Sequence, residues 1–357
     1  MRLAMAITGL GMRSSIGMDA AGACAALRAG IVRAREVPDV TILNEDGTPE
    51  HPIAHPVETV RGFQGKAKLL ALAMPAFKEV LAQGGLQGLP LERTGLYLAL
   101  PPRLMPQAGG AREGSRELLL CDRLVQWASL SVPRKNQREF WLGHAGVPHA
   151  LEQACQELAA GRLERCILGG VDSLLDSQTV QALHQRRRLK SQDAPDGLQP
   201  GEAAAFFVLE PLKSALQRRA QVHGLVTGVA FLSDESREEQ SVPGAALGHC
   251  VTSLLSSPSM GERAWFISDL NGEPSRSMEW GNLLVRLTAS HPGLRQAPLW
   301  HPASSLGDTG TASAAIGLCA VVRAFTRKYA PAEVALVLSS SDGPARGAIR
   351  VERYSAG

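Results

Sequence analysis

The chain has 357 residues, of which 45% are hydrophobic, 20% are charged and 4% are aromatic, and its formal net charge is +3. A chain of this length predicts two domains or one large two-lobed unit, since a domain holds about 150 residues. The hydrophobic content excludes intrinsic disorder, and the small net charge gives no indication of a nucleic-acid partner.

Short apolar runs alternate with longer amphipathic or Ala-rich segments. The apolar runs, which predict strands, are residues 4–10, 95–100, 166–171, 203–210, 224–231, 264–270 and 334–341. The amphipathic segments, which predict helices, are residues 18–28, 66–83, 147–160, 211–221, 245–256, 277–290 and 311–327. The segments with loop composition are residues 33–60, 190–200 and 232–243. Interleaved strands and helices indicate an α/β fold, and strands that are apolar throughout indicate a sheet buried on both faces.

One order of elements occurs twice. Residues 143–173 begin with GHAG, continue as a small-residue helix and end in a buried strand that reaches an acid in CILGGVDS. Residues 307–342 begin with GDTG and repeat that order, ending in VALVLSSSD. Two such units predict a duplicated α/β protein, with residues 1–217 as the N-terminal half and residues 218–357 as the C-terminal half.

The cysteines and the N-terminus predict a soluble protein of a reducing compartment. The six cysteines include no CxxC pair and show no metal-ligand spacing. We therefore expect no metal, no other cofactor and no disulfide framework, and a cytoplasmic location. The N-terminal stretch MRLAMAITGLGMRSSIG predicts a first strand rather than a signal peptide. No apolar run approaches the roughly 20 residues of a membrane span.

Several stretches resemble the β-ketoacyl synthase family, in the family's order. AITGLGMRSSIG resembles the opening VITGxGxxSPxG, and HALEQACQELAAGRLERCILGGVDS is similar to the helix and strand after the nucleophile. DGLQPGEAAAFFVLEPLKSALQRRAQVHGLVTG resembles DGFVxGEGAGxLVLExLxxAxxRGAxIxAxVxG almost without gaps. SDLNGEPSRS, SSLGDTGTASAAIG and LVLSSSDGPARGAIRVER take the places of NAHGTxT, KSxxGHxxGAAG and NSFGFGGxNxxLVL. The resemblance implies a thiolase-like fold of five αβαβα layers built from two duplicated halves, usually in a homodimer.

Acyl condensation in this family needs a thiolate at a helix N-terminus, two imidazoles and backbone N–H donors for an oxyanion. By the resemblance, the nucleophile position is His144, and the two catalytic histidine positions are Asn271 and Asp308. The supporting lysine position is Ala303, and the gating aromatic position of the C-terminal glycine-rich loop is Asp342. The resemblance therefore implies a site in which none of the catalytic residues is intact.

Two interpretations of these replacements stay open. His144, Asn271 and Asp308 could form a new constellation, in which Asp308 raises the pKa of His144 and orients it for general-base hydrolysis. The alternative, which we favour, is a hydrogen-bonded plug in an inactive site. Cys155 and His149, on the helix after His144, are interpreted as packing residues rather than as replacement catalysts.

Two classes of function follow. The first is a ketosynthase-like protein that acts by binding, either by hetero-pairing with a ketosynthase or as an adaptor or chaperone in bacterial toxin secretion. The second is an enzyme, either an atypical 3-oxoacyl-ACP synthase or acyltransferase of fatty acid or polyketide biosynthesis, or a hydrolase that uses His144 and Asp308. We expect the first class, and therefore no enzymatic activity.

The expected partner is a second copy of the chain or a ketosynthase-like protein, with a carrier protein or a secreted effector as further candidates. Nucleic acid and membrane are not expected partners. The basic run Arg186-Arg187-Arg188 with Lys190 is either a docking surface for an acidic carrier protein or a solvated loop.

Overall fold

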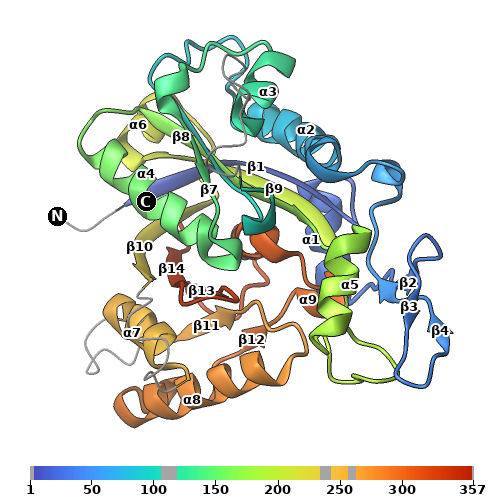
Figure 1. Cartoon of the computed structure of the whole chain (residues 1–357). Helices are drawn as coiled ribbons and strands as arrows, with labels where there is room; N and C mark the ends of the chain where they lie inside the picture. Colours follow the sequence, from blue (N-terminus) through green and yellow to red (C-terminus); the bar gives the residue numbers. More distant parts are fainter. Residues whose placement is uncertain (1–3, 106–118, 234–242, 256–262, 356–357) are drawn as a thin grey trace.

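The structure is a computed structural model that describes residues 4–105, 119–233, 243–255 and 263–355 (Figure 1). In the described residues, ten strands form one sheet in the order β12-β11-β13-β14-β10-β1-β9-β8-β6-β7. These strands are β1 (Met5–Ser14), β6 (Thr94–Ala99), β7 (Gln137–Phe140), β8 (Arg165–Ser173), β9 (Glu202–Pro211), β10 (Gly224–Leu232), β11 (Ala264–Ile267), β12 (Leu299–Trp300), β13 (Val334–Ser340) and β14 (Arg346–Glu352).

The helices cover both faces of the sheet and fill the space between its two halves. They are α1 (Ala20–Arg28), α2 (Gly65–Gln83), α3 (Leu120–Trp127), α4 (Gly146–Ala159), α5 (Ser177–Gln185), α6 (Leu212–Gln217), α7 (Ala245–Leu254), α8 (Pro274–Ser290), α9 (Ala303–Leu306) and α10 (Ser313–Thr326). Two short 3-10 turns, η4 (Gly143–Ala145) and η8 (Gly310–Ala312), precede α4 and α10.

The arrangement is that of the thiolase-like fold. Helices α2 and α3 lie on one outer face, α4 and α10 lie between the two halves of the sheet, and α7 and α8 lie on the other outer face (Figure 1). Helix α10 is almost entirely buried, because its Ala, Gly and Cys side chains allow strands on both sides to approach closely. The expected α/β, five-layered fold is confirmed.

The duplicated unit is also present. Turn η4, helix α4 and strand β8 follow one another in the first unit, and turn η8, helix α10 and strand β13 follow one another in the second. Strand β1 pairs with β9 on one side and β10 on the other, so one continuous sheet crosses the boundary between residues 217 and 218. The division into two halves at that boundary stays a prediction.

Some elements differ from the sequence-based expectation. Strands β7 and β14 and helices α3 and α5 were not predicted. The expected loop at 33–60 contains four two-residue strands, β2 (Arg35–Glu36), β3 (Ile42–Leu43), β4 (Pro49–Glu50) and β5 (Ile53–Ala54). Most of the loop expected at 232–243 lies outside the described residues.

Helix α5 and strands β2 to β5 stand apart from the layers, at the right of Figure 1. We call residues 35–54 and 177–198 the side module. Its interior is a small apolar cluster separate from the main cores and consists of Val40, Ile42, Val180, Leu183, Leu189 and Leu198. Among the helices that the structure describes, none is long and apolar enough to cross a membrane.

Candidate functional site

The two repeated turns meet at the centre of the molecule. His144 lies in η4 at the start of α4, and Asp308 lies two residues before η8, the turn that precedes α10. Because the two units have the same element order, the chain brings both helix starts together. His144 and Asp308 are 7% and 3% exposed, so the pair is inside the protein.

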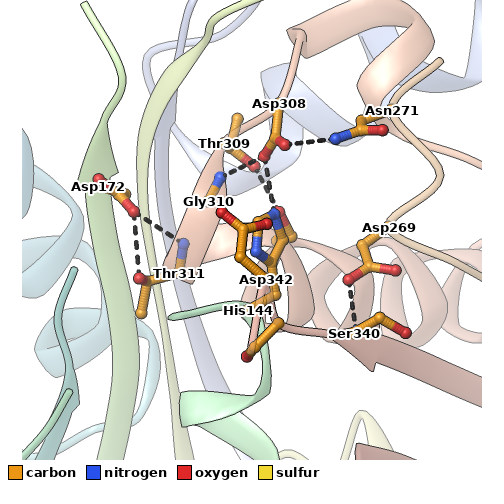
Figure 2. Close-up of polar contacts among 12 residues, drawn as sticks. His144, Asp172, Asp269, Asn271, Asp308, Thr309, Gly310, Thr311, Ser340 and Asp342 are labelled. Atoms are coloured by element: carbon orange, nitrogen blue, oxygen red, sulfur yellow. Dashed lines mark hydrogen bonds and ion pairs between the residues drawn. The ribbon is translucent and has the colours of Figure 1, made fainter. Parts of the chain in front are cut away.

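Both ring nitrogens of His144 have partners. Nε2 lies 2.8 Å from Oδ1 of Asp308, and Nδ1 lies 3.3 Å from Nη2 of Arg276 (Figure 2 shows the Asp308 contact). In the neutral tautomer with its proton on Nε2, the imidazole donates to the carboxylate and accepts from the guanidinium. The ring then has no free lone pair for a reacting group.

The surrounding charges shift the pKa values of both His144 and Asp308. Burial alone lowers the pKa of His144, but the Asp308 carboxylate outweighs burial and the Arg276 charge, so the pKa of His144 is raised. Burial acts to raise the pKa of Asp308, but His144 and Arg276 outweigh it and hold that pKa well below its usual range. The prediction that Asp308 raises the pKa of His144 therefore agrees with the geometry.

Asp308 is held in place from three sides. Its Oδ1 also accepts the backbone N–H of Gly310 at 2.7 Å, and its Oδ2 accepts Nδ2 of Asn271 at 2.7 Å (Figure 2). Asn271 Nδ2 in turn lies 2.8 Å from Oε2 of Glu273, the residue before α8. Asn271 is thus fixed between two carboxylates and does not point a free amide at an open space.

Arg276 is the central residue that the sequence analysis missed. It lies in the first turn of α8, is 7% exposed, and donates from Nη1 to Oδ2 of Asp269 at 3.0 Å and to the carbonyl of Ser340. Four carboxylates lie around the guanidinium: the buried Asp269, Glu273 and Asp308, and the exposed Asp342. A buried cation compensates them, because unpaired buried charges are strongly destabilising.

Asp342 closes the outer side of this network. Its Oδ1 lies 3.3 Å from Nη2 of Arg276, and its two oxygens accept from Nη1 and Nη2 of Arg188 at 2.7 and 2.9 Å. Its side chain is 60% exposed, so it marks the edge at which the network reaches solvent. The position that the resemblance assigns to a gating aromatic is therefore occupied by an ion-paired carboxylate.

Ala303 begins α9 and is the one predicted site position without a polar side chain in the network. It lines, together with Asp308, a cavity of about 10 Å³. That volume holds about one water molecule, whereas small-molecule sites are typically hundreds of Å³. The space directly beside Asp308 is too small for an acyl chain.

The family is indicated by a match over part of the chain. Residues 145–215, which begin directly after His144, match the model of the β-ketoacyl synthase N-terminal domain. Over these residues the chain is similar to the β-ketoacyl synthases. It is 33% identical over 85 residues, 22% of its length, to polyketide synthase PksM of Bacillus subtilis strain 168. It is 28% identical over 101 residues to polyketide synthase PksL of the same organism. These aligned stretches cover 2% of each relative's length.

Solved ketosynthases share the fold of this ketosynthase-like chain over 99% of its length. A type II polyketide ketosynthase in complex with its acyl-carrier protein superposes with a TM-score of 0.80 at 15% identity over 100% of that chain. The ketosynthase from module 6 of the bacillaene synthase of Bacillus subtilis 168 gives 0.77 at 15% identity over 72% of that chain. The ishigamide ketosynthase/chain length factor gives 0.76 at 18% identity over 100% of that chain.

The ketosynthase-like chain has no thiol at the start of α4. All six of its cysteines are buried free thiols. Burial raises the pKa of Cys24, Cys155 and Cys250 to about 12, and the other three are raised well above the usual value. A buried thiol of raised pKa is inert, because the thiolate is the nucleophile.

Two of the four basic residues in the run 186–190 form ion pairs with carboxylates of the same chain. Arg187 forms an ion pair with Glu45, and Arg188 forms ion pairs with Glu273 and Asp342. Arg186 and Lys190 remain exposed. In the described residues, no group of three or more His, Cys, Asp or Glu side chains is arranged to hold a metal.

Proposed function

We propose that this ketosynthase-like protein acts by binding another protein and does not carry out acyl condensation. The observation that carries the proposal is the state of His144 at the nucleophile position. Both of its ring nitrogens are engaged, by Asp308 and Arg276, in a buried network. A residue in that state has neither a thiolate to take up an acyl group nor a free lone pair to act as a base.

The surroundings of His144 support the same proposal. The site contains several buried charges, and the cavity next to Asp308 has room for about one water. A fatty or polyketide chain would have to displace charge-assisted hydrogen bonds between buried groups, which is strongly unfavourable. The hydrolase that uses His144 and Asp308 is disfavoured because Nδ1, the ring nitrogen that does not face Asp308, lies 3.3 Å from Nη2 of Arg276 and has no lone pair left for a water molecule.

A ketosynthase-like protein is the partner that we propose first. Similarity to the ishigamide ketosynthase/chain length factor supports hetero-pairing with a ketosynthase, and similarity to a ketosynthase solved with its acyl-carrier protein supports a carrier protein as a further candidate. Two chains of similar fold can pair through equivalent surfaces, as two copies of one chain do in a symmetric dimer. An adaptor role in secretion remains the alternative.

The test is acylation. The protein is incubated with acyl-CoA and with acyl-carrier protein, beside an active ketosynthase as the positive control, and its intact mass and the loss of thioester are measured. We expect no adduct and no thioester turnover above background, for the wild type and for His144→Ala alike.

Two outcomes would overturn the proposal. The first is a stable adduct that disappears when one cysteine is replaced, which would identify an acyltransferase. The second is thioester turnover abolished by His144→Ala, which would identify the hydrolase. Co-purification with a co-expressed ketosynthase from the same genome then tests the partner, and a failure to co-purify would favour the adaptor role.

A further inference from the structure

The side module is a packed unit of its own. Its two segments are joined through its apolar cluster and through polar contacts within the module. Nε2 of Gln181 donates to the carbonyl of Thr41 at 2.8 Å, and Nε2 of His184 lies 2.7 Å from the carbonyl of Leu43. The backbone N–H of Glu45 donates to Oδ2 of Asp193 at 2.8 Å. These contacts make residues 35–54 and 177–198 move as one body.

One edge of the module is fixed to the main body by backbone hydrogen bonds. The N–H of Asp308 donates to the carbonyl of Gln199 at 2.7 Å, and the N–H of Gly201 donates to the carbonyl of Asp308 at 2.8 Å. The N–H of Leu174 donates to the carbonyl of Gly201 at 3.1 Å. Residues 199–201 are therefore a firm attachment, directly next to the turn that carries Asp308.

The edge of the module that faces the His144 network is joined by one guanidinium. Nε and Nη2 of Arg188 donate to Glu273 at 2.5 and 2.8 Å, and Nη1 and Nη2 donate to Asp342 at 2.7 and 2.9 Å. The Arg188 side chain is 23% exposed, so these contacts lie just below the surface. Arg188 reaches from the module to two residues of the main body that also bind Asn271 and Arg276.

Two exposed ion pairs also join the module's margin to the main body. Arg35 pairs with Glu58 and Arg61 pairs with Asp39, with every one of these side chains about half exposed. Exposed pairs contribute little to stability. Leu174, beside the attached edge, is the residue outside the module that packs against its apolar cluster in the described residues. Away from that edge, the joint is held by ion pairs, whereas the layers of the fold are held together by buried apolar surface.

We propose that the side module is a lid over the His144 network, hinged at residues 199–201 and strapped shut by Arg188. Opening an apolar joint exposes hydrophobic surface to water, whereas opening this joint exchanges charge-assisted hydrogen bonds for hydration, so the lid opens without unfolding the sheet. In the open state, the carboxylate oxygens of Glu273 and Asp342 that Arg188 covers are presented to solvent and to a binding partner. The inference depends only on the contacts of Arg188 and holds whether or not the site is catalytic.

The test compares two neighbouring arginines by hydrogen exchange with mass spectrometry. Arg188→Met keeps the apolar stem and removes the strap, whereas Arg187→Met removes an exposed pair with Glu45 and a hydrogen bond to the carbonyl of Asp193, both of them contacts within the side module. For Arg188→Met we expect exchange about tenfold faster in peptides that cover residues 186–198 and 269–276, the size expected for one lost charge-assisted contact. Peptides from β9 should be unchanged, and in Arg187→Met the peptides that cover residues 269–276 should exchange as in the wild type, because Arg187 has its contacts within the module.

Asp342→Asn is the second variant, because it changes an exposed side chain outside the core and weakens half of the strap. It should accelerate the same peptides by a smaller factor. Unchanged exchange at residues 186–198 in both Arg188→Met and Asp342→Asn overturns the lid. So does acceleration that is as large in β9 as in the module, since that pattern reports global destabilisation.

Discussion

At the scale of single residues, the site is dominated by buried charge. His144, Asp308 and Arg276 are each at least nine-tenths buried, and each has the others among its partners. Removing one member of such a set leaves an uncompensated charge, which destabilises a protein by about 3–5 kcal/mol. The three side chains therefore stabilise one another, as expected for a hydrogen-bonded plug in an inactive site.

The pair predicts a defined pH dependence of stability. The pKa of His144 is higher in the folded than in the unfolded protein, so its protonation favours folding. This stabilisation is complete at pH values below about 6.5, the pKa of an unfolded histidine, and it is lost as the pH rises through the folded pKa. The lowered pKa of Asp308 contributes above about 3.9 and is lost as pH falls through its folded pKa. The joint contribution is therefore largest between about pH 4 and 6.5.

The free energy of unfolding in urea, measured for His144→Gln and for the wild type at several pH values across and above this range, checks the predicted pH dependence. We expect a loss of about 3 kcal/mol near pH 5.5 that shrinks toward alkaline pH. His301→Gln, at an exposed histidine next to α9, should show no such profile. A loss that grows with rising pH would contradict the assigned direction.

At the scale of elements, the turn η8 fixes how the two units meet. Asp172, at the end of β8, accepts the backbone N–H and the hydroxyl of Thr311 at 3.0 and 3.1 Å (Figure 2). Gly310 has a φ of +53°, and a Cβ on it would lie 2.1 Å from Oδ2 of Asp172. The acid of the first unit can approach the turn of the second only because that position is glycine.

A pair of glycine substitutions tests this contact. Gly310→Ala should lower the free energy of unfolding by about 3 kcal/mol, because it adds backbone strain and displaces Asp172. Gly281→Ala, in α8, meets no atom within 4 Å and should raise the free energy of unfolding by about 0.5–1 kcal/mol. Thermal or urea unfolding measures both, and equal effects of the two substitutions would show that η8 tolerates a side chain.

The sequence predicted the elements whose burial is continuous and missed those that pack on one narrow side. Helix α10 and strand β9 are buried along almost their whole length, so composition alone revealed them. Helix α5 buries only Val180 and Leu183 and carries polar residues elsewhere, so its pattern resembled a loop. The role of Arg276 could not be predicted from its neighbours, because its partners come from segments far away in the chain.

At the scale of the whole molecule, the distribution of thiols gives a simple test of the packing and of the proposed inactivity. Native protein treated with iodoacetamide should gain no adduct on the timescale in which a free thiol is fully alkylated, because all six cysteines are buried. Protein in denaturant should gain six. Rapid labelling of a single cysteine in the native state, identified by peptide mass, would reveal a reactive thiol and argue for an acyltransferase.

The position of β1 has a consequence for how the chain acquires its structure. This strand leaves the ribosome before both of its neighbours, β9 and β10, which begin about 200 residues later. Until they are synthesised, the backbone N–H and C=O groups on both edges of this apolar strand have no sheet partner. Unpaired strand edges in a partly synthesised chain promote aggregation. We therefore expect slow folding that completes late and requires chaperones during synthesis, because the pairing of β1 joins segments that are far apart in the chain.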